Sequence, residues 1–357
     1  MNGSMIADSA EKLFSTLIDK ELLEAFDRSM FPEALWTQVD QSGFPAALAS
    51  EASGGIGLGW VECFPILYGV GYWQVPLPLA DTMIANYLIS AAGGALPGGR
   101  VAIADGPVEI AIGDDGRMSG KLVDVSWARH CQNVLIETDG VDGGGGRLAV
   151  VSLVQPGVRL QQYENHAAEP LDSIALECAQ IQLLSPVPVT STPGLLRTFG
   201  ALACSAMLCG ALDSCLRQAV VYANDRVQFG RPLAKYQAIQ QQLALLAGEI
   251  SAARTATLVA FSASEATLAF DTAVAKVRAS EAATLAANIC HQVHGAIGFT
   301  HEHSLHFSTR RLWAWRGRHG SDAYWAGRLG QLAIDAGSRD FWERFTDRFD
   351  AMMPIAA

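Results

Sequence analysis

The chain has 357 residues, of which half are hydrophobic and only 17% are charged, and its net charge is −11. This length suits two or three domains, and so small a charged fraction favours an oligomer with buried faces. The negative charge argues against nucleic acid as a partner, because phosphate binding needs a basic face. We expect neither a membrane span nor a signal peptide, because no long apolar run and no N-terminal apolar segment is present.

The seven cysteines are an odd number, and no two of them have C-x-x-C spacing. We interpret them as buried free thiols rather than metal ligands, so we expect no metal site. Free thiols are typical of a reducing compartment, which predicts a cytoplasmic protein.

The pattern changes twice along the chain. Residues 1–98 have helical spacing, 99–190 contain short β-branched runs separated by Gly, Asp and Pro, and 191–357 are helical again and rich in alanine. We therefore predict a multidomain α+β protein with an N-terminal helical domain, a middle β-barrel or sandwich, and a C-terminal four-helix bundle.

In the N-terminal part, apolar residues recur at helical spacing over residues 12–31, and Pro32 can begin the next helix. A glycine-rich turn follows at 51–59. By itself this turn fits a plain connection between two helices.

In the middle part, β-branched runs predict strands within 101–113, 131–139, 147–154 and 178–184. The four glycines at 143–146 lack the Lys-Ser/Thr of a phosphate-binding loop. We interpret them as the tip of a hairpin.

In the last part, Ile239, Leu243, Leu246 and Ile250 repeat at intervals of four, three and four. This spacing is that of a helix with one buried face, and alanine-rich helices pack closely. A four-helix bundle is the natural assembly of such helices.

The segment 226–237, RVQFGRPLAKYQ, combines the groups that a dinucleotide cofactor needs. Arg226 offers a planar fork of donors to a pyrophosphate. Phe229 offers an apolar ring, and Gln228 and Gln237 offer amide groups.

This segment resembles the flavin-contact signature of the acyl-CoA dehydrogenase family. A second segment, QVHGAIGFT at 292–300, resembles the family's "Q.hGG.Gf" motif: Gln292 supplies an amide, and Gly295 lets backbone approach a ligand. The turn at 51–59 resembles a third family motif, and Arg310 stands at the family's position after the second.

The resemblance implies the helix–strand–helix architecture and one FAD held by the first signature of one subunit and the second signature of its neighbour. It also implies a reaction. A glutamate removes the α-proton of an acyl-CoA, the flavin takes a hydride from the β-carbon, and the electrons leave to an electron-transferring flavoprotein.

The family's glutamate lies in a "YEGTSE" turn, which a gapless count places at 318–323. His319 stands at the glutamate position, and Ser321 stands at that of the threonine, where we expect it to contact the flavin. The family's alternative base position falls on Gly200. Neither position carries a carboxylate.

Three explanations remain open. His319 is itself the base, or an acid such as Asp322 or Glu302 reaches in, or a partner chain supplies the base. Some family members that shorten steroid side chains are α2β2 heterotetramers of that third kind. Two departures suit a partner subunit: the chain is short, and its middle domain lacks the family's "TEP..GSD" segment. Ser126 and Trp127 can replace that segment, although Trp127 equally suits the β-barrel core.

The resemblance thus predicts FAD as cofactor, an acyl-CoA as substrate in lipid or steroid catabolism, and either a homodimer, a homotetramer or a heterotetramer. A flavin-dependent monooxygenase of the same fold and a non-catalytic scaffold subunit are the alternatives. A monooxygenase consumes oxygen, and an empty scaffold is colourless.

Overall fold

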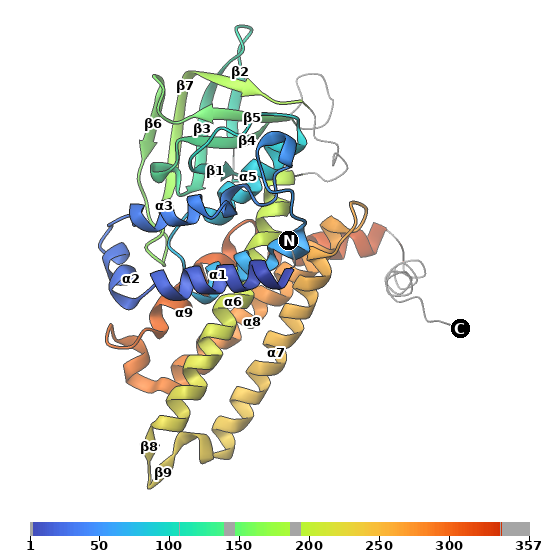
Figure 1. The fold of residues 1–357 in the computed structure, drawn as a ribbon. Coiled ribbons are helices and arrows are strands. Elements are labelled where there is room, and N and C mark those ends of the chain that lie inside the picture. The colour runs from blue at the N-terminus through green and yellow to red at the C-terminus, as the bar shows by residue number, and fades with distance from the viewer. Residues whose placement is uncertain (1–2, 107, 139–146, 186–193, 336, 338–357) are drawn as a thin grey trace.

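The computed structural model describes residues 3–106, 108–138, 147–185, 194–335 and 337. The N-terminal part is helical, as predicted, and Figure 1 shows it lying between the sheet and the long C-terminal helices. Its α-helices are α1 (Gly3–Leu17), α2 (Lys20–Asp27), α3 (Glu33–Gln41), α4 (Trp60–Tyr72) and α5 (Leu79–Ala91).

The single helical stretch predicted over residues 12–31 is wrong. The carboxylate of Asp19 accepts a hydrogen bond of 2.8 Å from the backbone N–H of Leu22 and so begins a new helix, α2. The expected start of a helix at Pro32 is confirmed, because α3 follows it directly. The turn at 51–59 contains a short 3₁₀ turn before α4 begins.

The middle part forms one curled sheet with the strand order β1-β4-β5-β7-β3-β2 and β6 paired with β7. Its strands are β1 (Val101–Ala104), β2 (Val108–Ile112), β3 (Arg117–Ser126), β4 (Asn133–Thr138), β5 (Arg147–Ser152), β6 (Val158–Gln161) and β7 (Leu171–Leu183). The pair β1–β4 is parallel, and the other pairs are antiparallel.

The sequence pattern missed β3 and β6, and β7 begins before the run predicted at 178–184. These segments carry many polar residues, because part of each strand faces solvent. The glycines at 143–146 lie outside the described residues, so the hairpin tip stays a prediction.

The predicted C-terminal bundle is confirmed by four long helices. They are α6 (Leu195–Asp225), α7 (Gln237–Phe261), α8 (Leu268–His294) and α9 (Leu305–Gly317). A small hairpin, β8 (Val227–Gln228) and β9 (Arg231–Pro232), joins α6 to α7 and projects from the end of the bundle farthest from the sheet (Figure 1).

Two of these helices, α6 and α7, are long and apolar enough to cross a membrane by length and composition alone. The most apolar window of α6 is 94% buried, because this helix is the core of the bundle. The window of α7 is only 28% buried. Leu245 and Leu258 are the large apolar side chains of α7 that are exposed.

Helices α4 and α6 touch through their backbones. A Cβ on Gly71 would lie 1.8 Å from the carbonyl oxygen of Met207, and a Cβ on Gly210 would lie 2.0 Å from that of Tyr68. Each helix therefore needs a glycine where the other crosses it. This contact joins the N-terminal helices to the bundle in one hydrophobic core.

The cysteines follow the prediction except at one position. Six are buried free thiols, whereas Cys178 on β7 is exposed. Cys204 donates to the carbonyl of Trp315 at 3.2 Å, and Cys290 donates to that of Cys215 at 3.5 Å, so buried thiols link helices. No cluster of His, Cys, Asp and Glu in the described part of the chain has the arrangement of a metal site.

Candidate functional site

A pocket of about 290 Å³ lies where the sheet meets the start of α6 and the end of α9. It contains the turn at which the sequence places the base. The residues that line it are Asp105, Gly106, Asp124, Ser126, Asn165, Leu171, Arg197, Ala314, Gly317, Arg318, His319, Gly320 and Tyr324.

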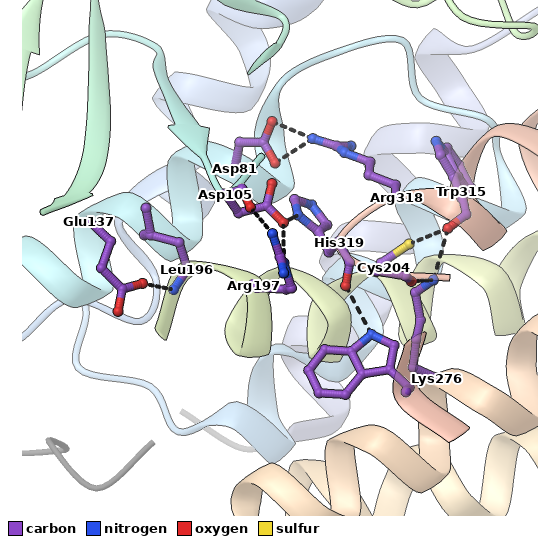
Figure 2. A network of polar contacts seen from close by, with 12 residues as sticks. Asp81, Asp105, Glu137, Leu196, Arg197, Cys204, Lys276, Trp315, Arg318 and His319 are labelled. Carbon is purple, nitrogen blue, oxygen red and sulfur yellow. Dashed lines mark hydrogen bonds and ion pairs between the residues drawn. The ribbon is translucent and has the colours of Figure 1, made fainter. Parts of the chain in front are cut away.

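His319 and Gly200, the two base positions, meet at one place. The His319 side chain is only 4% exposed, and a Cβ on Gly200 would lie 2.5 Å from its Nδ1. That same nitrogen lies 3.0 Å from Oδ2 of Asp105, an ion-pair distance that Figure 2 shows. The imidazole of His319 thus fills the space that a side chain at position 200 would need.

Asp105, at the end of β1, has two basic side chains beside its carboxylate. Besides His319, the guanidinium of Arg197 on α6 lies 3.7 Å from its carboxylate and also donates to its backbone carbonyl. Burial alone raises the pKa of the Asp105 carboxyl, but His319 and Arg197 outweigh it and lower that pKa to about 2. A carboxylate with so low a pKa is a weak base.

A second buried pair lies beside the first. The guanidinium of Arg318 donates to both carboxylate oxygens of Asp81, at 2.6 and 2.5 Å, from the turn after α9 to helix α5 (Figure 2). Burial disfavours the charged guanidinium, yet Asp81 raises the pKa of Arg318 above its usual value. The Asp81 carboxylate is therefore already paired with a cation. Of the two acids that line the pocket, Asp105 and Asp124, it is Asp124 that is exposed to solvent.

The other acids that the sequence offered do not line this pocket. Asp322 pairs with Arg316 at 3.1 Å, and Glu302 lines a separate pocket beside α6 with Trp73 and Tyr222. The structure therefore gives no support to either as a substitute base.

The serines and the tryptophan of the predicted flavin contacts differ in their surroundings. Ser126 is buried and lines the pocket, whereas Trp127 is buried in the core of the sheet, where its ring lies 5.6 Å from that of Phe26. Ser321 accepts the N–H of Tyr324 at 3.2 Å and so caps the helical stretch that follows.

The first flavin signature lies on the β8–β9 hairpin and the start of α7. Arg226 and Gln237 are exposed, and Phe229 is 92% exposed at the hairpin tip. Arg226 makes no side-chain hydrogen bond or ion pair in the described part of the chain, and the amide of Gln228 reaches only the carbonyl of Val227. These groups face solvent in the single chain, so they are available to contact a ligand or a second subunit.

The second signature ends α8. Gln292 and Gly295 are exposed, and Gly295 has φ 64° with open space where a Cβ would lie. His294 is instead buried and stacked on Tyr222, so it belongs to the core. Arg310 donates to Asp27 at 2.6 Å beside a pocket of about 690 Å³.

Known proteins resemble this chain in sequence and in fold. A model of the acyl-CoA dehydrogenase C-terminal domain matches residues 198–324. The chain is 30% identical over 290 residues to the acyl-CoA dehydrogenase IpdE2 of Mycobacterium tuberculosis, which covers 80% of this chain and 82% of IpdE2. The chain belongs to the acyl-CoA dehydrogenase family. The acyl-CoA dehydrogenase FadE27 of the same organism is 25% identical over 331 residues, covering 82% of this chain and 88% of FadE27.

Two solved structures of acyl-CoA dehydrogenase relatives are similar over nearly the whole chain. The steroid ACAD Tcur3481-Tcur3483, in a G363A variant, has a TM-score of 0.83 at 25% identity, covering 94% of this chain and 98% of that one. The ChsE4-ChsE5 complex from Mycobacterium tuberculosis has a TM-score of 0.80 at 21% identity, covering 92% and 96%. The second likeness shows the fold alone.

Proposed function

We propose that this chain is one subunit of an acyl-CoA dehydrogenase formed with a second, different chain of the family. This subunit binds FAD and lacks the catalytic base. The proposal depends on one observation: the ring of His319 occupies the place where the family's catalytic glutamate is expected. His319 lies on Gly200, so neither base position presents a carboxylate, and the nearby Asp105 has a pKa of about 2. The partner chain then supplies the glutamate that removes the α-proton of the thioester.

The residues of this chain fit a flavin dinucleotide. Arg226, Gln237 and Gln292 are exposed donors, and the ring of Phe229 is uncovered. In the assembly, Arg226 faces the pyrophosphate, where a charge-assisted hydrogen bond is strong. The bound flavin would supply hydride acceptance from the β-carbon and pass the electrons to an electron-transferring flavoprotein.

The proposed heterotetramer is supported by two features. Helix α7 is largely uncovered, and two of its large apolar side chains, Leu245 and Leu258, are exposed. Two structurally similar proteins, Tcur3481-Tcur3483 and ChsE4-ChsE5, are described by pairs of chains. A second family chain is the occupant that both features favour.

A self-sufficient enzyme is the second candidate, and one distance favours it. A carboxylate at Nδ1 orients a general-base histidine, and Oδ2 of Asp105 lies 3.0 Å from this nitrogen, without the angle of a hydrogen bond. In that case Asp105 holds His319, and His319 removes the proton.

The deciding experiment compares the chain alone, a family chain that carries the glutamate, and the two co-expressed. We expect acyl-CoA-dependent dye reduction only in the co-expressed pair, and its loss when the partner's glutamate is changed to glutamine. Turnover by the chain alone that disappears in His319→Ala would support the second candidate and overturn the first. A colourless pair would indicate a scaffold, and substrate-dependent oxygen consumption would indicate a monooxygenase.

A further inference from the structure

Lys276, on α8, is a buried lysine with an unusual set of partners. Its side chain is fully buried, and it forms no ion pair in the described part of the chain. Its Nζ instead donates to three backbone carbonyls: Trp315 at 3.2 Å, Arg316 at 2.8 Å and Gly320 at 3.0 Å. Ser280 Oγ is a fourth, longer contact at 3.5 Å.

Three carbonyl acceptors favour the charged form of this side chain, whereas burial lowers the pKa of its ammonium group. An ammonium group has three N–H donors, whereas a neutral amine has two. Two of the carbonyls belong to the last turn of α9, where the helix dipole favours a positive charge and where carbonyls lack partners within the helix. The buried charge is therefore stabilised by aligned carbonyl groups rather than by an acid.

The third carbonyl connects Lys276 to the pocket. Gly320 follows His319 directly, and the backbone carbonyl of His319 accepts a hydrogen bond of 2.9 Å from the indole of Trp325. The turn from Arg316 to Gly320 is thus held at both ends from inside the bundle. Figure 2 shows Lys276 reaching this turn from the side opposite Asp105.

We propose that Lys276 is the positioning residue of the pocket: its ammonium group fixes the turn so that His319 lies against Gly200 and pairs with Asp105. This inference rests on the proposed function only in taking this pocket as the family's base site. Lys276 does not touch the pocket and acts through the backbone of the turn.

The test measures how well His319 is protected in the co-expressed complex. Diethyl pyrocarbonate modifies accessible neutral imidazoles, and peptide mass spectrometry reports each histidine separately. In Lys276→Met, we expect the modification rate of His319 to rise about tenfold or more, while that of His130, in the sheet domain, stays unchanged. Lys276→Arg, which keeps a cation with several donors, should restore most of the protection.

The matched control is Gln74→Met. Gln74 is also buried and donates to backbone carbonyls at the end of a helix, α4, and to Ser214 at 3.0 Å. It does not line the pocket around His319. Gln74→Met should lower stability without exposing His319.

Protection of His319 that is unchanged in Lys276→Met, or lost equally in Gln74→Met, would overturn the proposal. If Lys276→Met does not fold, Lys276→Gln takes its place, because it keeps two N–H donors without the charge; full protection there would also overturn the proposal. The readout needs no turnover. A complex without dehydrogenase activity would refute the proposed function and leave this result standing.

Discussion

The ring of His319 rests on the α-carbon of Gly200, so that a Cβ at position 200 would lie 2.5 Å from Nδ1. Real Cβ atoms essentially never come that close to a neighbour. Gly200→Ala should therefore displace the imidazole and destabilise the chain by about 1–3 kcal/mol, as overpacking does. Urea unfolding measures this loss.

The control for Gly200→Ala is Gly330→Ala. Gly330 is exposed in the helical stretch after the turn, with open space where a Cβ would lie. There the added methyl group should raise stability by up to about 1 kcal/mol, because alanine favours helix. Equal effects at the two positions would contradict the contact between Gly200 and His319.

A carboxylate at position 319 should give this chain a base of its own. In His319→Glu, the introduced carboxylate lies beside Asp105, and two like charges raise the pKa of one of them. A positioned base contributes about 10²–10⁴-fold, so dehydrogenation by the flavin-loaded protein should rise within that range. His319→Gln, which has no base, is the control. Unchanged activity of His319→Glu with full flavin content would rule out this site as the base position.

The first signature is tested at Arg226. Loss of a charge-assisted hydrogen bond to a pyrophosphate costs about 1.5–3 kcal/mol, so Arg226→Ala should weaken FAD retention by roughly 10–150-fold. Equilibrium dialysis or the absorbance of the flavin measures it. Arg217→Ala, on the same helix, is the control, because Arg217 binds the hydroxyl of Tyr72. Equal FAD retention in both variants would remove Arg226 from the cofactor site.

The exposed face of α7 is tested at Leu245. An unpaired charge buried in an interface costs several kcal/mol, so Leu245→Glu should split the oligomer at micromolar concentration. Light scattering gives the mass in solution. Val154→Glu places the same charge on an exposed residue of the sheet domain and should leave the mass unchanged. A wild-type chain that is a flavin-loaded monomer would refute the interface.

The sequence predicts those parts of the fold that depend on residues close together in the chain, and it misses those that depend on single contacts. The start of α3 at Pro32 and the spacing from Ile239 to Ile250 are local patterns, and both gave the right elements. The break at Asp19 depends on one capping hydrogen bond, which hydrophobic spacing does not show. Strand β3 interrupts the alternation of a strand, because its register shifts between Met118 and Gly120 and between Leu122 and Val125.

The candidate site follows the same rule. Motif counting gave positions 200 and 319, but their contact joins residues more than a hundred positions apart in the chain. The roles of Asp105 and Lys276 are likewise set by contacts that the turn after α9 makes with the end of β1 and with α8. A lysine within an alanine-rich helical run is the signal of Lys276 that the sequence carries, and its burial is known only from the structure.

Acid pH should destabilise the contact between the N-terminal helices and the sheet. His130 stacks on Phe31 at 4.3 Å, and burial, together with Arg129 and Arg100, lowers its pKa to about 4. The unfolded chain therefore binds the proton first, and stability falls as the pH drops from about 6.5 toward 4. His130→Gln should flatten this part of the curve in urea unfolding at a series of pH values. An unchanged slope would contradict the lowered pKa.

Helix α7 has only 28% of its apolar window buried, and this exposure affects how much of the protein can accumulate in the cell. A copy that has not met the proposed partner chain exposes this helix to water. Unassembled copies are then the form that aggregates or meets chaperones and proteases. In the proposed heterotetramer, the supply of the partner chain, rather than the folding free energy of this one, sets how much of the protein accumulates.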